Sequence, residues 1–101
     1  MGKLTKPDGY VYKGHFKNNM ANGIGKCTYP DKLEYMGEWK DDMQDGKGKE
    51  VYPGGEIYEG TFKEDYRHGK GFLVYEDGST YNGNFKWGVC HGLGIRKFKD
   101  G

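Results

Sequence analysis

The sequence predicts an all-β protein: one elongated, single-layer, twisted antiparallel sheet of stacked β-hairpins with about nine strands. Three observations support this fold class. The 101 residues include 19 Gly, more than twice the usual share of ~7%, and only 34% hydrophobic residues, so a conventional aliphatic core cannot be built. Nine Tyr, five Phe and two Trp supply rings in its place. The third observation is an internal repeat of 23 residues, and no segment shows helical periodicity.

The first half of each repeat has the pattern Tyr-x-Gly-x-Phe/Trp-Lys. Because side chains alternate along a strand, the two rings and the glycine share one face and the polar residues between them point away. This pattern predicts strands near residues 10–16, 33–39, 56–62 and 79–85. The repeat positions are Tyr12, Gly14, Phe16, Tyr35, Gly37, Trp39, Tyr58, Gly60, Phe62, Tyr81, Gly83 and Phe85.

The second half has the pattern Gly-x-Gly-x-x-x-ring and predicts strands near residues 25–29, 48–52, 71–75 and 94–98, with a further strand near 3–6 in the same frame. Turns rich in Pro, Asp and Gly close one side, and longer polar loops, such as residues 18–22, close the other. The chain then divides into a half repeat, 1–11, and repeats 12–34, 35–57, 58–80 and 81–101. The repeat positions are Gly23, Gly25, Tyr29, Gly46, Gly48, Tyr52, Gly69, Gly71, Tyr75, Gly92, Gly94 and Phe98.

The glycines and rings are expected to stabilise the sheet together. A glycine inside a strand leaves bare backbone, and a large ring on the neighbouring strand can lie over it. Each ring buries ~150–250 Å². Three rings per repeat therefore replace the missing aliphatic core, and we interpret these positions as structural.

This pattern resembles the MORN (membrane occupation and recognition nexus) repeat, whose typical unit is Tyr-x-Gly-x-Trp-x-x-Gly-x-x-x-Gly-x-Gly-x-x-x-Tyr-x-x-Gly. The segments beginning at Tyr35 and at His68 match it almost letter for letter, and the resemblance extends from Gly2 to Gly101. Two departures stand out: Lys32 replaces the turn glycine of the first copy, and Trp87-Gly88 replaces an expected polar pair.

The resemblance implies a non-catalytic adaptor. Such arrays occur in junctional membrane proteins, phosphatidylinositol phosphate kinases, a lysine methyltransferase, and cytoskeletal or ciliary proteins. The family supplies no catalytic residues of its own, so we expect no enzyme activity and no cofactor. We expect a protein–protein scaffold in a cytoplasmic, cytoskeletal or ciliary assembly. The alternatives are a peripheral membrane module for anionic lipid headgroups and a regulatory segment of a larger enzyme.

Other chemistry is disfavoured by the sequence. Gly-x-Gly lacks the following helix that a phosphate site needs. On a linear sheet Cys27 and Cys90 would be too far apart for a disulfide, and His68 and His91 too far apart to share a metal. A net charge of +1 argues against nucleic acid. The N-terminal residues lack an apolar signal core, so we expect a protein that is not secreted.

Three sets of residues are candidates for binding. The lysines at one repeat position form either a row for anionic headgroups or a solvated strand end. Position nine of each repeat, counted from its first Tyr, is apolar and either packs on the next hairpin or faces a partner. Trp87 stands where the other copies have Asn18, Asp41 and Glu64, and exposed Trp is enriched at binding hot spots. The first two sets are Lys17, Lys40, Lys63 and Lys86, and Met20, Met43, Tyr66 and Val89.

The ends of the predicted sheet are open. Unpaired edge strands invite pairing with another chain, which positive charge only partly prevents. We therefore expect the chain to be docked on a protein partner, or associated with itself, through its edges or its ring-lined face. The charges near the two ends are Lys3, Lys6, Arg96, Lys97 and Lys99.

Overall fold

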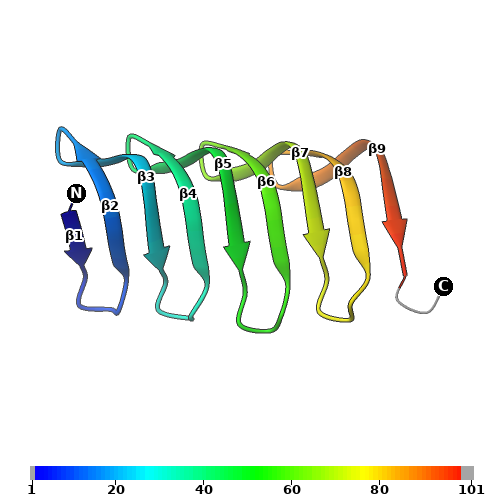
Figure 1. Cartoon of the computed structure of the whole chain (residues 1–101), viewed down its shortest axis with the longest axis horizontal. Coiled ribbons are helices and arrows are strands. Elements are labelled where there is room, and N and C mark those ends of the chain that lie inside the picture. Colours follow the sequence, from blue (N-terminus) through cyan, green and yellow to red (C-terminus); the bar gives the residue numbers. More distant parts are fainter. Residues whose placement is uncertain (1, 99–101) are drawn as a thin grey trace.

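A computed structural model, which describes residues 2–98, confirms the all-β fold. The strands lie side by side in chain order, each antiparallel to the next, in one open sheet with principal-axis extents of 47 × 24 × 17 Å (Figure 1). Among the described residues no helix has the length and apolar character needed to span a membrane. The strands are β1 (Gly2–Thr5), β2 (Val11–Lys17), β3 (Met20–Thr28), β4 (Glu34–Lys40), β5 (Met43–Val51), β6 (Ile57–Lys63), β7 (Tyr66–Val74), β8 (Thr80–Lys86) and β9 (Val89–Lys97).

A row of glycines crosses the whole sheet. Gly25 pairs with Gly14 on one side and with Gly37 on the other, and the same glycine-to-glycine register is repeated from β1 to β9. The repeat length of 23 residues sets this register. The result is a line of bare backbone that runs perpendicular to the strands.

The turns between β2 and β3, β4 and β5, β6 and β7, and β8 and β9 correct the expected loops. The second strand of each hairpin begins five residues before the predicted start, at Met20 and not at residue 25. Each connection is a two-residue turn, and Asn18 and Asn19 both have positive φ, 53° and 64°. Asn and Asp tolerate this conformation, and turns of this handedness match the twist of a hairpin. The other three turns are Asp41–Asp42, Glu64–Asp65 and Trp87–Gly88.

On the opposite edge, Lys32 adopts the conformation of the glycine that it replaces. Its φ is 78°, against 107° for Gly9 and 110° for Gly55 in the equivalent turns. The Lys32 N–H donates to the carbonyl of Tyr29 at 2.9 Å, as the Gly55 N–H does to Tyr52 at 3.0 Å. The loop after Tyr29 therefore keeps the shape of the other copies. The corresponding C-terminal segment, Lys99 to Gly101, lies outside the described residues.

Most of the core is a zigzag of eight rings on one face, called here the ring face, and Ala21, Cys27 and Leu73 are buried with them. Successive rings meet edge to face, with centroids 5.0 to 5.4 Å apart and interplanar angles of 80° to 90°. All are buried except Phe16, which is 38% exposed. The first two rings of each repeat thus form most of the core, as predicted. The third ring is not in it: Tyr29 and Tyr75 are half-buried against the core and Phe98 is 63% exposed. In order of contact the rings are Phe16, Tyr12, Trp39, Tyr35, Phe62, Tyr58, Phe85 and Tyr81.

The tyrosine at the start of each repeat covers the second glycine of the Gly-x-Gly pair on the next strand. A Cβ placed on Gly48 would lie 2.5 Å from Cε1 of Tyr35, so the ring occupies the space of the missing side chain. The Tyr35 hydroxyl then donates to the carbonyl of Glu38 at 2.8 Å, at the β-bulge between Gly37 and Trp39. Burial raises the pKa of the equivalent Tyr58 to about 12, so its hydroxyl stays protonated and keeps donating.

Candidate binding surfaces

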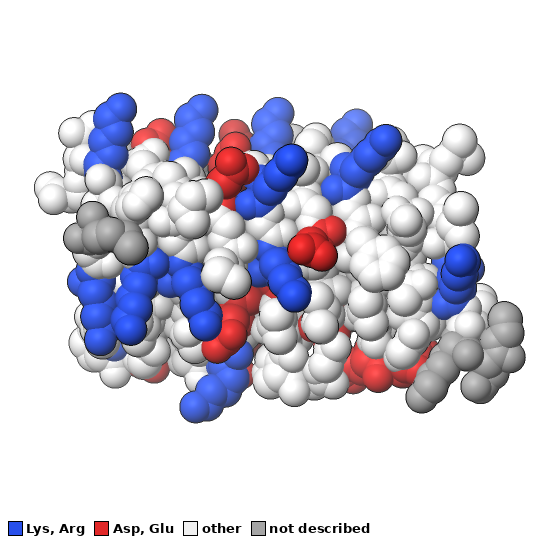
Figure 2. Space-filling view, viewed as in Figure 1, with Lys and Arg blue, Asp and Glu red and all other residues white. Residues whose placement is uncertain are grey.

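The four lysines and the four residues at position nine lie along one long edge of the sheet, called here the turn edge. In each hairpin the last residue of the first strand faces the first residue of the second, as Lys63 faces Tyr66. Position nine is therefore in a strand and not in a loop, which corrects the predicted placement. Figure 2 shows Lys and Arg side chains recurring along this edge, with acidic side chains beside them. The four pairs are Lys17–Met20, Lys40–Met43, Lys63–Tyr66 and Lys86–Val89.

The acidic residues of the turn edge tie successive hairpins together. The Asp65 N–H donates to the carbonyl of Gln44 at 3.0 Å, and the Gln44 N–H donates back to Oδ1 of Asp65 at 2.7 Å. Asp42 and Ala21 form the same pair of hydrogen bonds one repeat earlier. These carboxylates thus act as backbone acceptors. Within residues 2–98 no carboxylate forms an ion pair with the four lysines of the edge.

Trp87 lies at the centre of an aromatic cluster at the C-terminal end of the turn edge. Its ring centroid is 4.8 Å from that of His68 and 5.9 Å from that of Tyr66, and Nζ of Lys63 lies 5.7 Å from its ring centroid. Trp87 is 44% exposed and Tyr66 52%. The fold therefore brings together three of the predicted residues, Lys63, Tyr66 and Trp87, and Val89 is exposed at the start of β9 in the hairpin of Trp87.

The other predicted residues lie elsewhere along the edge. Met20 and Met43 are half-buried at the first two hairpins, beside Lys17 and Lys40, and Lys86 faces Val89 at the last. Half-burial of the two methionines agrees with packing against neighbouring hairpins.

His68 is a member of the cluster that sequence reasoning missed. Its Nδ1 accepts the backbone N–H of Trp87 at 3.4 Å. At the same repeat position Oδ1 of Asn22 accepts the N–H of Asp41 at 3.1 Å, and Asp45 accepts that of Glu64 at 3.4 Å. A hydrogen-bond acceptor for the backbone of the next turn therefore recurs at this position in three copies. This recurrence could have identified His68 from the sequence.

A partly buried polar network, which sequence reasoning did not predict, lies on the ring face. Arg67 forms ion pairs with Glu50 at 3.1 Å and Glu56 at 3.3 Å, and its guanidinium lies 4.7 Å above the ring centroid of Tyr58. Arg67 also donates to the hydroxyl of Tyr52 at 3.2 Å. Gln44, one repeat earlier, likewise donates to the hydroxyl of Tyr29 at 3.0 Å. These groups satisfy one another and join adjacent repeats.

On the ring face a polar depression of about 380 Å³ lies beside Arg67, and another of about 440 Å³ lies near the N-terminal repeats. The second is lined by Tyr10, Tyr29, Gln44 and the carboxylates of Asp8 and Asp42, among others. The ladder rings pack against each other, so this face presents mostly polar groups and already engaged carboxylates. Cys27 is buried and Cys90 exposed, both as free thiols, and no three His, Cys, Asp or Glu residues within 2–98 are grouped to hold a metal.

Comparison with known proteins identifies the repeat. The family model described as MORN repeat matches four successive segments, residues 12–33, 35–57, 58–80 and 81–101. Together these segments cover most of the chain. No curated protein matches the sequence.

Proposed function

Because the chain belongs to the MORN repeat family, we propose that it is a non-catalytic protein–protein interaction module that binds through the edge patch. The edge patch consists of Lys63, Tyr66, His68, Trp87 and Val89. Repeats of this family are generally associated with protein or membrane interaction. The edge patch contains an exposed Trp and an exposed Tyr, two residue types that are enriched at binding hot spots.

The conformation of Trp87 is the observation that carries this proposal. Its φ is 49°, a left-handed conformation that is unfavourable for a bulky residue. The other copies fill this turn position with Asn or acidic residues, which the fold accepts equally well. An exposed Trp in a costly conformation is therefore not required by the repeat itself, and a binding role explains its presence.

The setting of this module is part of the same proposal. Related arrays occur in cytoskeletal and ciliary proteins, and we place this chain in a cytoplasmic assembly of that kind, as one of its subunits. The free thiols of Cys27 and Cys90 suit a reducing compartment. A chain with this role provides a binding surface, and any catalysis is carried out by other domains or subunits.

A second candidate function is binding of anionic lipid headgroups by the lysine row of the turn edge. It is supported by the absence, within residues 2–98, of ion pairs to these four lysines. Cosedimentation with anionic liposomes at ~150 mM salt tests it, since an electrostatic row must pellet with such vesicles. Pelleting that requires anionic lipid and falls for Lys17→Gln/Lys40→Gln would favour this function.

The protein-binding function is tested by affinity capture from the native source with the full chain as bait. We expect a partner that the wild type retains and Trp87→Asn loses. Phe98→Asn is the matched control, because Phe98 is an exposed ring, 63% accessible, near the opposite long edge of the sheet. Direct titration of the identified partner must reproduce the difference. A partner retained equally by all three proteins would refute the role of the edge patch.

A further inference from the structure

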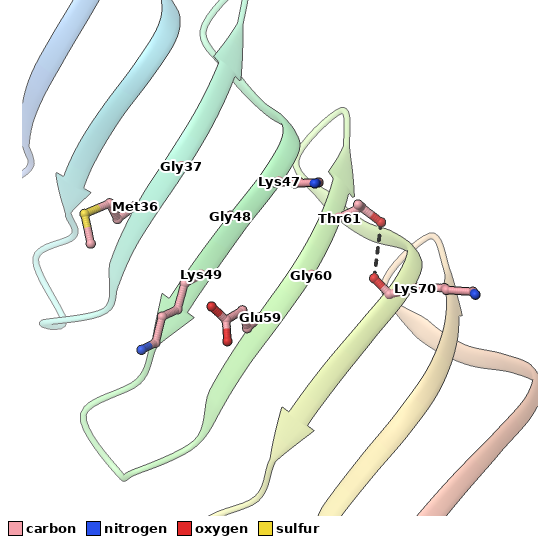
Figure 3. Close-up of a pocket in the computed structure, with 9 residues that line it drawn as sticks. All are labelled: Met36, Gly37, Lys47, Gly48, Lys49, Glu59, Gly60, Thr61 and Lys70. Atoms are coloured by element: carbon pink, nitrogen blue, oxygen red, sulfur yellow. Dashed lines mark hydrogen bonds between the residues drawn. The ribbon is translucent and has the colours of Figure 1, made fainter.

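The face opposite the rings, called here the outer face, is hollowed in its middle. A depression of about 520 Å³ crosses β4, β5 and β6 and reaches β7 (Figure 3). Met36, Lys49 and Glu59 form one bank, and Lys47, Thr61 and Lys70 form the other. Gly37, Gly48 and Gly60 form the floor between the banks. We call this depression the outer trough.

The floor of the outer trough cannot accept another strand. Gly48 is paired with Gly37 on one side and Gly60 on the other, so the backbone there belongs to the interior of the sheet. A ligand in the trough therefore touches flat backbone and must obtain its specificity from the side chains on the banks. A segment without internal hydrogen bonds of its own, lying across the strands, fits such a floor.

The banks are predominantly positive. Lys47, Lys49 and Lys70 are exposed, and the three ion pairs found within residues 2–98 involve none of them. The lining includes a single acidic residue, Glu59. Glu38, next to the trough, accepts the backbone N–H of Lys47 at 2.5 Å, so one of its carboxylate oxygens is already hydrogen-bonded. The charge favours an acidic ligand.

The spacing of the lysines limits the conformation of that ligand. Lys47 and Lys70 occupy the same position of successive repeats, on β5 and β7, so they are two strands or roughly 9.6 Å apart along the trough. A polyproline II segment advances ~9.3 Å in three residues and returns its side chains to the same side. We propose that the outer trough binds an acidic protein segment in this extended conformation, with a carboxylate at every third residue.

A membrane surface fits the trough less well. A flat bilayer would meet the tips of the lysines and leave the depression of about 520 Å³ unfilled. A lipid surface also has no fixed period, whereas Lys47 and Lys70 are held two strands apart. An acidic segment fills the depression and places carboxylates at the spacing of Lys47 and Lys70. It occupies a surface separate from the edge patch.

The test is a fluorescence anisotropy titration of the full chain with two labelled peptides of identical composition. One peptide repeats Glu-Pro-Pro four times, and the other places its four Glu before its eight Pro. At ~20 mM salt, where exposed charges are weakly screened, we expect the regular peptide to bind about fivefold more tightly. Lys47→Gln/Lys70→Gln should weaken that binding about fivefold, as expected for two exposed ion pairs, and Glu59→Gln should strengthen it.

Lys32→Gln/Lys97→Gln is the matched control, because it removes the same charge outside the trough. Circular dichroism confirms that each variant is folded. Equal affinity for the two peptides, or an equal loss in the control variant, would overturn the proposal by showing non-specific charge attraction. Binding to phosphatidylserine vesicles that depends on Lys47 and Lys70, without preference between the peptides, would overturn it in favour of a membrane.

Discussion

At the scale of single residues, the tyrosine at the start of each repeat has two structural roles. Its ring covers the backbone of a glycine on the next strand, as Tyr35 covers Gly48, and its hydroxyl donates to the carbonyl at a β-bulge. Neither partner can change alone, because the ring needs the empty space and the bare backbone needs the ring. This pairing explains why the sequence is rich in both residue types.

Gly48→Val tests this pairing. The branched side chain would displace the Tyr35 ring and break the contacts of the ladder on both sides, so we expect a loss of roughly 3 kcal/mol in the free energy of unfolding. Urea denaturation followed by circular dichroism measures it. Gly54→Val is the control, since there an added Cβ meets only the flexible carboxylate of Glu76. Similar losses in both variants would contradict the account of the glycine row.

Lys32→Gly should have the opposite effect. Lys32 holds a φ of 78° in a turn where Gly9 stands in the preceding copy. Removing the side chain relieves the left-handed strain, so we expect the free energy of unfolding to rise by about 1 kcal/mol. The greater conformational entropy of glycine in the unfolded chain offsets part of this gain. Denaturant titration measures the gain. Lys32→Ala keeps a Cβ in the same conformation and should give no such gain; if it does, strain is not the cause.

At the scale of elements, the two-residue turns connect one hairpin to the next. Three of the four turns, those that follow β4, β6 and β8, donate an N–H to the preceding repeat, and in two of them an aspartate accepts one in return. The last turn has Gly88 at this position, which donates to Arg67 at 2.9 Å but has no carboxylate to accept. The reciprocal hydrogen bonds therefore strengthen the N-terminal junctions more than the C-terminal one.

Asp65→Gly copies the last turn and should cost about 1 kcal/mol, because the N–H of Gln44 loses its acceptor while the positive φ of 72° stays acceptable to glycine. Asp65→Asn keeps the Oδ1 acceptor and should be close to neutral. Thermal unfolding of the two variants compares them. If the Asn variant is destabilised as much as the Gly variant, the negative charge and not the hydrogen bond accounts for the effect.

The hairpins and the turns rich in Pro, Asp and Gly were predictable from sequence, and the two-residue turns on the other side were not. Alternation around Tyr-x-Gly-x-Phe/Trp placed the first strand of each hairpin within about one residue. The second strands begin earlier than expected because residues such as Asn22 and Gly23 look like a loop, although the preceding two-residue turn already starts the strand. The partners of Arg67 were hidden because its contacts to Glu50 and Glu56 depend on how neighbouring hairpins align in space.

At the scale of the whole molecule, the sheet divides its residues between folding and recognition. The rings and glycines pack together on one face, whereas the turn edge and the outer trough expose Trp, Tyr and Lys side chains. All nine residues of β9 are exposed, with Val89, Leu93 and Ile95 between 63% and 89% accessible. Arg96 contributes little edge protection, because its guanidinium lies 4.2 Å from the ring centroid of Tyr75 on the ring face.

The exposure of β9 predicts association. An edge strand with apolar side chains and few charges pairs readily with another strand, so the purified chain should self-associate or require a partner. Light scattering at high micromolar concentration measures this. A stable monomer of about 11.5 kDa with a full β signal and no partner would contradict the prediction.

The thermal midpoint of Trp87→Asn tests most directly whether the binding residues are separate from the folding residues. Asn18 fills the equivalent turn position in the first hairpin with a φ of 53°, so Asn fits this turn. We predict a midpoint within about 2 °C of the wild type, because the lost ring contacts are exposed and Asn relieves the left-handed strain of Trp87. A fall of more than about 6 °C, the shift expected for ~1 kcal/mol in a chain of this size, would make Trp87 a packing residue and contradict the account.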